Sequence, residues 1–292
     1  MKRWIRLQVA ISIVAATAGM RPLLCAQQSP CVRLALAEDA ALELEARWEP
    51  CRESKYGLFA ENEVLRTLAP VESKHRYAAA LFTPFLPKEP VSVGAVWEVE
   101  REAVLPFLRH FHPGARAELH HGSGAAPGTY ACLRALGPQA VEILIRAHAE
   151  FELAGGVTYT PAQFEGRLVL DPTNGELRSF HLALPSRNTN VDVNAPMEYR
   201  ETPDGPLQQG MEADIGWVPR MELASADSSE QRESAWTRSI PDTEARSLLA
   251  RRFYAFAAID WLSFDVAVQR ALALEKPLHV VVLFGTLDDE SC

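Results

Sequence analysis

Positive charge is scarce in this chain. Lys and Arg number 29 against 38 Asp and Glu, which gives a formal net charge of −9 over 292 residues. Four of the bases, Lys2, Arg3, Arg6 and Arg21, lie within the first 26 residues, where there is no acid. The remainder of the chain is therefore more acidic still. Because an acidic surface repels phosphate backbones, the sequence argues against a nucleic-acid partner.

Long hydrophobic runs are also missing. The apolar stretch from Leu7 to Met20 is too short to span a bilayer comfortably, but it follows a basic segment as a secretory signal does. Small-residue cleavage sites are available after Ala18 or Ala26. We predict a signal peptide over residues 1–26 and an extracytoplasmic protein, periplasmic or secreted. An uncleaved signal that holds the chain near a membrane is the alternative.

Cysteine is sparse, with five in the whole chain. Cleavage after Ala26 would leave Cys31, Cys51, Cys132 and Cys292, and an exported compartment permits disulfides. The sequence between Cys31 and Cys51 resembles a helix, which would hold its ends roughly 30 Å apart. A disulfide needs α-carbons within about 7 Å. The pair could form only if the helix breaks, for example near Pro50; buried thiols are the alternative.

Familiar catalytic and metal signatures are absent. There is no Walker motif, GxSxG elbow, HExxH or dinucleotide fingerprint. The stretch Asp171 to Gly175 lacks the alternating acids and closing glutamate of a calcium loop, so it is interpreted as a turn. Four histidines form an H-x-H and an H-H pair that could ligate zinc or copper, but no cysteine or acid completes a set, and capping or solvated roles are favoured. These are His110, His112, His120 and His121.

The pattern along the chain predicts an α+β protein. Residues 27–112 are rich in helix formers and proline breaks and are expected to be mainly helical, with one helix over Arg101 to His110. Residues 113–223 alternate in hydrophobicity and are expected to form an antiparallel β-rich domain. Its clearest elements are a strand over Ala140 to Leu153, a hairpin around the Asp171 turn, and a strand over Met211 to Leu223.

The C-terminal part has a different pattern. Polar residues 224–241 indicate a linker, and residues 242–292 predict two helices, begun by Asp242 and Ser263, then a buried strand over Val280 to Phe284. His148 and His279 fall inside strand patterns and are expected to be sheet residues. A helix, a strand and a loop closing on Cys292 make up the first half of a thioredoxin-like α/β unit.

Several motifs occur together in an order that resembles the selenoprotein N family. They are spread over residues 146–292, about the last half of the chain, and are RAHAEFEL (146–153), YTPAQFEGRLVL (159–170), TNVDV (189–193), MEADIGWVPRMEL (211–223) and GTLDDESC (285–292). The last of these resembles the segment that leads into the family's Ser-Cys-selenocysteine-Gly centre. The resemblance implies that Ser291 and Cys292 belong to a redox centre, and that a selenocysteine, encoded by a codon usually read as a stop, follows Cys292.

The resemblance implies an exported thiol/selenol–disulfide oxidoreductase that acts on protein disulfides or oxidants. Cys292 would be the partner thiol of the selenol, and the selenocysteine is the only special group expected. Without a following helix, Asp288 to Glu290 and the terminal carboxylate would disfavour a Cys292 thiolate, so the 292 residues alone are expected to be inactive. The alternative is a non-catalytic extracytoplasmic binding or scaffold protein whose β-rich domain recognises a partner.

Overall fold

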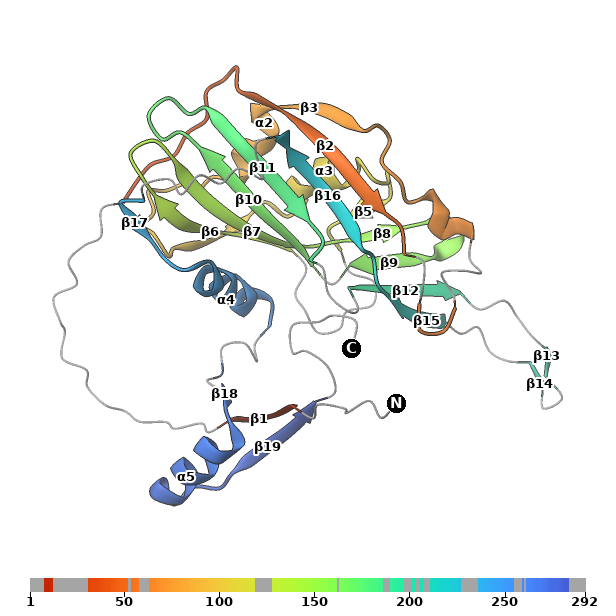
Figure 1. The fold of residues 1–292 in the computed structure, drawn as a ribbon. Helices are drawn as coiled ribbons and strands as arrows, with labels where there is room; N and C mark the ends of the chain where they lie inside the picture. The colour runs from red at the N-terminus through yellow and green to blue at the C-terminus, as the bar shows by residue number, and fades with distance from the viewer. Residues whose placement is uncertain are drawn as a thin grey trace.

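A computed structural model of the chain describes residues 8–12, 31–51, 54–57, 63–118, 128–161, 163–185, 190–196, 201–202, 205–206, 211–226, 236–254, 259 and 261–283. These residues form a mixed α+β fold in which strands predominate and pair antiparallel (Figure 1). The predicted α+β class and the antiparallel β-rich region are confirmed.

A nine-stranded sheet forms the main body. Its strands follow the order β17-β6-β7-β10-β11-β16-β2-β3, and β4 pairs with β6. The strands are β2 (Ala41–Glu49), β3 (Lys74–Ala78), β4 (Val96–Val99), β6 (Gly128–Leu136), β7 (Val141–His148), β10 (Phe164–Leu170), β11 (Leu177–Ala183), β16 (Arg220–Ser225) and β17 (Arg238–Ser239).

A second, five-stranded sheet follows the order β15-β12-β9-β8-β5. It consists of β5 (Ala115–Arg116), β8 (Glu150–Glu152), β9 (Thr158–Pro161), β12 (Val191–Pro196) and β15 (Met211–Gly216), and the pair β13 (Glu201–Thr202) and β14 (Gly205–Pro206) lies apart from it. The chain passes between the two sheets several times; it does so at Ala149, between β7 and β8, and at Trp217–Pro219, between β15 and β16. The single strand predicted over Met211 to Leu223 is therefore two strands, one in each sheet.

The main core lies on the inner face of the large sheet, against short helices. Phe82, Phe85, Phe107 and Phe180 are fully buried, and Phe180 lies 4.8 Å from the Phe107 ring and 5.2 Å from that of Phe82. Burying each such ring contributes about 2–3 kcal/mol. These short helices are η1 (Glu63–Thr67), α2 (Ala79–Phe82), η2 (Thr83–Phe85), η3 (Arg101–Val104) and α3 (Leu105–Leu108). A further short helix, η4 (Ala154–Gly156), connects β8 and β9 of the second sheet and has no buried residue.

The expectation of a mainly helical N-terminal region is wrong. Residues 41–49 form β2, because Leu42 and Leu44 point into the core while Glu43 and Arg47 point outward. This period of two overrides the helix propensity of Ala, Leu and Glu. The helix expected over Arg101 to His110 is present in part, as η3 followed by α3.

The predicted hairpin is confirmed. Strands β10 and β11 pair from Glu165 opposite Ala183 to Leu170 opposite Leu177. In the turn between them, Asp171 Oδ1 accepts hydrogen bonds from the Thr173 backbone N–H at 2.9 Å and from its hydroxyl at 2.6 Å. These bonds lower the Asp171 pKa, with Arg178 adding to the effect, so the carboxylate stabilises a turn.

The C-terminal part begins with α4 (Asp242–Phe253), which packs on β6 and β7 (Figure 1). A small unit follows, made of β18 (Trp261–Leu262), α5 (Phe264–Leu274) and β19 (His279–Leu283) with β1 (Gln8–Ser12). Strand β1 lies between the other two and pairs antiparallel with both. The buried strand expected over Val280 to Phe284 is found only in part: β19 lies in an antiparallel three-stranded sheet instead of a parallel one, Val280 is 41% exposed, and Phe284 lies outside the described residues.

Two further expectations bear on this region. The segment predicted as a linker contains β17, which adds to the edge of β6. Strand β1 consists of residues that the sequence assigns to a signal peptide. Among the residues that the structure describes, no helix is both long and apolar enough to cross a membrane.

Candidate functional site

The residues predicted to carry redox chemistry, Ser291 and Cys292, lie outside the described residues, as do His120 and His121. Cys31, Cys51 and Cys132 are thiols in the structure. Cys132 is buried, and burial, with the nearby charge of Glu244, raises its pKa to about 11. A thiol of that kind is a poor nucleophile, so Cys132 is a packing residue.

His110 and His112 both make hydrogen bonds within the protein. His110 Nε2 donates to the backbone oxygen of Glu72 at 2.7 Å, and its Nδ1 accepts from the Tyr77 hydroxyl at 3.1 Å. Burial and the charge of Glu72 raise the Tyr77 pKa to about 12, which keeps this hydroxyl a donor. The Gly114 backbone N–H donates to His112 Nδ1 at 3.0 Å, and burial lowers the His112 pKa.

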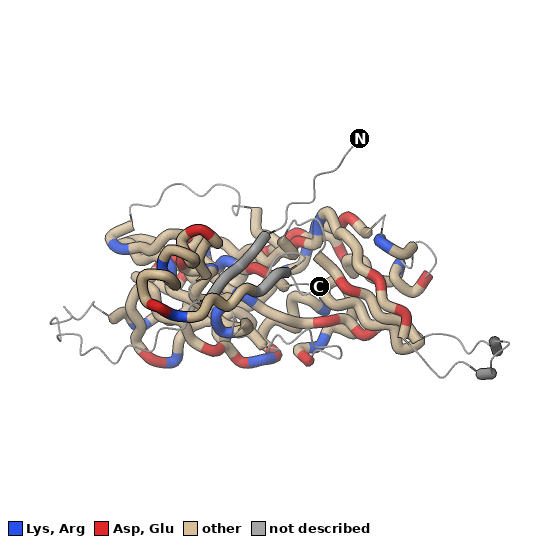
Figure 2. The backbone as a smooth tube through the Cα atoms, turned by 90° about the horizontal axis from the view of Figure 1, so that it is seen from below, with Lys and Arg blue, Asp and Glu red and all other residues tan. Residues whose placement is uncertain are grey.

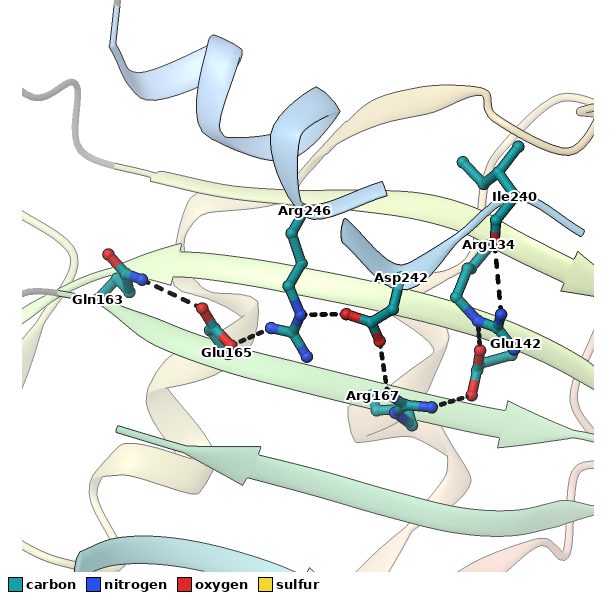
Figure 3. Close-up of polar contacts among 8 residues, drawn as sticks. All are labelled: Arg134, Glu142, Gln163, Glu165, Arg167, Ile240, Asp242 and Arg246. Carbon is teal, nitrogen blue, oxygen red and sulfur yellow. Dashed lines mark hydrogen bonds and ion pairs between the residues drawn. The ribbon is translucent and has the colours of Figure 1, made fainter. Parts of the chain in front are cut away.

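The most developed polar arrangement lies between α4 and the outer face of the main sheet (Figure 3). We call it the α4 network. Its bases and acids alternate in one continuous chain across four elements: Arg134 from β6, Glu142 from β7, Arg167 and Glu165 from β10, and Asp242 and Arg246 from α4.

Two ion pairs join the sheet to α4, Arg167–Asp242 and Glu165–Arg246, and Glu142 holds Arg167 from within the sheet. Glu142 is 2% exposed and is paired with both Arg134 and Arg167. Arg167 also donates to Asp242 Oδ2 at 2.8 Å. Burial lowers the pKa values of Arg134 and Arg167, and for Arg134 the charge of Arg167 adds to this effect. Both guanidinium groups nevertheless stay charged, so removing an acid would strand a cation at a largely buried site.

The network has a neighbouring apolar contact. Ala245 and Leu249 of α4 pack on Cys132 of β6 and Leu144 of β7, and all four side chains are buried. The helix is therefore held both by ion pairs near its start and by apolar packing in its middle. Figure 2 shows that bases and acids are otherwise interspersed along the described strands.

A buried cluster lies under the last turn of α4, and we call it the His148 cluster. It contains Arg146, His148, Gln163, Phe253 and Tyr254. Arg146 donates to His148 Nε2 at 3.1 Å and to Gln163 Oε1 at 2.7 Å. Gln163 in turn donates to Glu165 at 3.2 Å, which joins the cluster to the α4 network. His148 is confirmed as a buried sheet residue.

Three curated proteins match the chain, and each is named selenoprotein N. The chain is 27% identical to the Mus musculus protein over 87% of its own length and 30% identical to the Danio rerio protein over 76%. It is 26% identical to the Homo sapiens protein over 87%. The chain is selenoprotein N-like. It spans about half the length of these relatives, namely 56%, 48% and 52% respectively.

No protein-family model matches this selenoprotein N-like chain, and no solved structure does. The motifs that carry the resemblance in the sequence nevertheless map onto the site. RAHAEFEL covers the end of β7 and all of β8 and contains Arg146 and His148. YTPAQFEGRLVL contains Gln163, Glu165 and Arg167.

Sequence reasoning missed the α4 network in this selenoprotein N-like chain, although a signal for it was present. Glu165 and Arg167 are two residues apart on one strand, so they share a face. Asp242 and Arg246 are four apart on a helix and therefore also share a face. What the sequence could not show is that these two faces meet, since that depends on where α4 packs.

Proposed function

We propose that the chain belongs to an exported thiol/selenol–disulfide oxidoreductase. In this proposal it supplies the strand-rich body and the C-terminal segment that leads into the redox centre. The similarity to three proteins named selenoprotein N carries this proposal. It is supported by the motif of residues 285–292, which resembles the approach to that family's redox centre. In this proposal a selenocysteine follows Cys292.

The proposed reaction begins with a thiol and a selenol. The selenolate attacks one sulfur of a substrate disulfide, and that bond breaks as a mixed selenenylsulfide forms. Cys292 then displaces the substrate thiolate and closes a selenenylsulfide with the selenium. The substrate disulfide is reduced to two thiols, and the centre is oxidised by two electrons. An external dithiol reduces the centre again.

The strand-rich body has a supporting role in this proposal. Cys132 is held under α4 with a raised pKa, so the body supplies packing at that position and no redox thiol. The α4 network fastens to this body the helix that leads to α5 and β19. A thioredoxin-like arrangement of the C-terminal unit also belongs to the proposal. Strand β1 lies within the predicted signal peptide, so cleavage of that peptide would remove β1 from its place beside β19. The edge of β19 would then be available to pair with another strand.

Disulfide reduction tests the proposal. The protein is expressed from its native gene in its native host, as the parent and as the variants Cys292→Ser and Cys31→Ser. Reduction of a protein disulfide by a dithiol donor should be lost in Cys292→Ser and kept in Cys31→Ser, whose side chain is exposed. Equal activity of the two variants would refute a redox role for Cys292.

A non-catalytic binding role is the second candidate. Met211 and Trp217 are 43% and 45% exposed at the edge strand β15 of the second sheet. Ser54 and Lys55 already pair with the end of β15, at Gly216 and Ile215, so an extended peptide could add only to the part of this edge near Met211. This candidate predicts that the native protein has no disulfide reductase activity.

A further inference from the structure

Strand β1 occupies the middle of the small C-terminal sheet, between β18 and β19 (Figure 1). It pairs antiparallel with β19 over five residue pairs, from Gln8 opposite Leu283 to Ser12 opposite His279. Its other edge pairs antiparallel with β18, where Ile11 lies opposite Leu262. Within the described residues, this sheet has no other strand. The C-terminal unit is therefore a sheet only because the N-terminal segment takes part in it.

Strands β18 and β19 run parallel to each other, because both are antiparallel to β1. Helix α5 connects them, so β18, α5 and β19 form a β-α-β crossover with one strand place between its two strands. In the parallel sheets that are built from such crossovers, a strand in that place runs parallel to its neighbours. Strand β1 fills the place in the opposite direction.

The unit still exposes apolar surface when β1 is in place. Ala267 and Ala271 are the buried residues of α5, whereas Leu272 on the same helix is 69% exposed. Six of the ten large apolar side chains that are exposed in the described residues lie between Ile259 and Val280. Apolar surface that is concentrated in this way marks a site that another element covers. The sheet with β1 therefore leaves surface that a different arrangement of this unit would bury.

Strand β1 belongs to a segment that the sequence predicts to be removed. Residues 8–12 lie within the predicted signal peptide, and the candidate cleavage sites after Ala18 and Ala26 both follow them. Cleavage at either site would take β1 from the molecule. Strands β18 and β19 would then be separated by a vacant strand place, and two strands that do not touch form no sheet. The C-terminal unit must therefore change its arrangement when the N-terminal segment is lost.

We propose that the N-terminal segment regulates the redox centre: pairing of Gln8–Ser12 with β18 and β19 keeps the C-terminal unit inactive, and cleavage activates it. This inference rests on the proposed function, in which β19 leads through residues 284–292 into a centre at Cys292 and the polypeptide continues beyond it. Loss of β1 opens the place between β18 and β19 to a parallel strand from that continuation. The centre is then assembled only after export, and a precursor that has not been exported stays inactive.

Disulfide reduction by processed and unprocessed protein tests the inference. The parent is compared with the double variant Ala18→Phe/Ala26→Phe, whose large side chains block both cleavage sites. Both are expressed from the native gene in the native host, and intact mass shows which form retains residues 1–26. The unprocessed variant should reduce a protein disulfide at least about tenfold more slowly than the processed parent, because only molecules that have released β1 are competent.

The matched control adds Ala10→Pro to the unprocessed variant. Ala10 is the central residue of β1, and a proline there removes a backbone N–H from a strand that pairs on both edges. Reductase activity should return to within about twofold of the processed parent, although residues 1–26 are still attached. A variant that stays inactive would show that pairing of β1 is not the cause.

The same assay separates the inference from the proposed function. Equal activity of the processed parent and the unprocessed variant overturns the inference and leaves the proposed function standing. A processed parent without reductase activity refutes the proposed function itself, and regulation of the redox centre is refuted with it.

A cross-link tests the pairing of β1 without a redox assay. Val9 lies opposite Val282, so the substitutions Val9→Cys and Val282→Cys in the unprocessed variant bring two thiols close enough for a disulfide, which needs α-carbons within about 7 Å. In the matched pair, Val9→Cys with Val281→Cys, the two positions face opposite sides of the sheet. Peptide mapping after mild oxidation should find the first link and not the second. Absence of the first link, or equal yields of both, overturns the inference whatever the reductase activity.

Discussion

The two faces of the main sheet are built from opposite kinds of side chain. The inner face is aromatic, with Phe180 packed edge-on or tilted against the phenylalanines of the short helices. The outer face under α4 carries alternating bases and acids, and a buried histidine, His148, lies beside them. Apolar packing does not depend on pH or salt in the way that ion pairs do. We therefore expect the inner face to determine the global stability of the protein, and the outer face to hold α4 on the sheet.

The largest expected effect is on the inner face. Phe180→Ala should lower the free energy of unfolding by about 3–5 kcal/mol, because the ring is fully buried and the site cannot collapse around the cavity. Urea denaturation measures this loss. Phe264→Ala is the control, since Phe264 is 49% exposed, and should change stability by less than about 0.5 kcal/mol. Equal losses in the two variants would show that Phe180 is not part of a packed core.

The next effect is on the outer face. Glu142→Gln should cost about 2–3 kcal/mol, because it removes the acid shared by Arg134 and Arg167, whose side chains are 14% and 20% exposed. The loss should appear first as faster hydrogen exchange in α4, with the inner-face strands less affected. Glu176→Gln, on an exposed turn, should leave both unchanged. Uniform loss of protection across both faces would mean that the network stabilises the whole body equally.

The alkylation rate of Cys132, which lies beneath α4, tests whether α4 is docked on the outer face. With a pKa of about 11, Cys132 should be alkylated at about pH 8 at least a hundredfold more slowly than exposed Cys31. Mass spectrometry of the labelled peptides gives the two rates. Glu142→Gln should accelerate only the Cys132 rate. Equal labelling of both thiols in the folded parent would contradict a docked α4.

The smallest effect concerns the part of the outer face that α4 leaves uncovered. The hydrogen bond with His181 is the main cause of the lowered pKa of Glu222, with Arg47 and Arg220 adding to it. A lowered pKa stabilises the folded state above the unfolded value, and that stability is lost as pH falls through the folded value. Glu222→Gln should therefore reduce the loss of stability below about pH 4.5 by less than about 1 kcal/mol, as shown by acid titration of melting temperature. An unchanged acid profile would show that this pair contributes nothing.

Much of the strand-rich body could be predicted from the sequence, because its signals are local. The alternation of β10 and β11 and the Asp171 turn lie within one short stretch, so pattern and turn chemistry agree. In Ala41–Glu49 the same kind of alternation was present, but the residues are good helix formers. There burial of Leu42 and Leu44 against distant strands decided the outcome. Propensity is a weak guide where tertiary contacts choose the period.

For the polar and aromatic contacts beneath α4, the sequence predicted the separate elements but not how they meet. Sequence placed His148 in a strand and began a helix near Asp242, but it could not bring Phe253 onto the His148 ring. That contact joins segments about a hundred residues apart in sequence and depends on which sheet face the helix covers. The redox motif was recognised by resemblance, and its residues Ser291 and Cys292 lie outside the described part of the structure.

The measurement that tests the central claim most directly is intact mass with selenium analysis of the protein purified from its native source. The proposed function predicts a species that carries selenium's isotope pattern and a mass beyond that of residues 27–292. A protein that contains no selenium and has the mass of residues 27–292 or less would contradict the oxidoreductase proposal. The non-catalytic binding role would then be the remaining candidate.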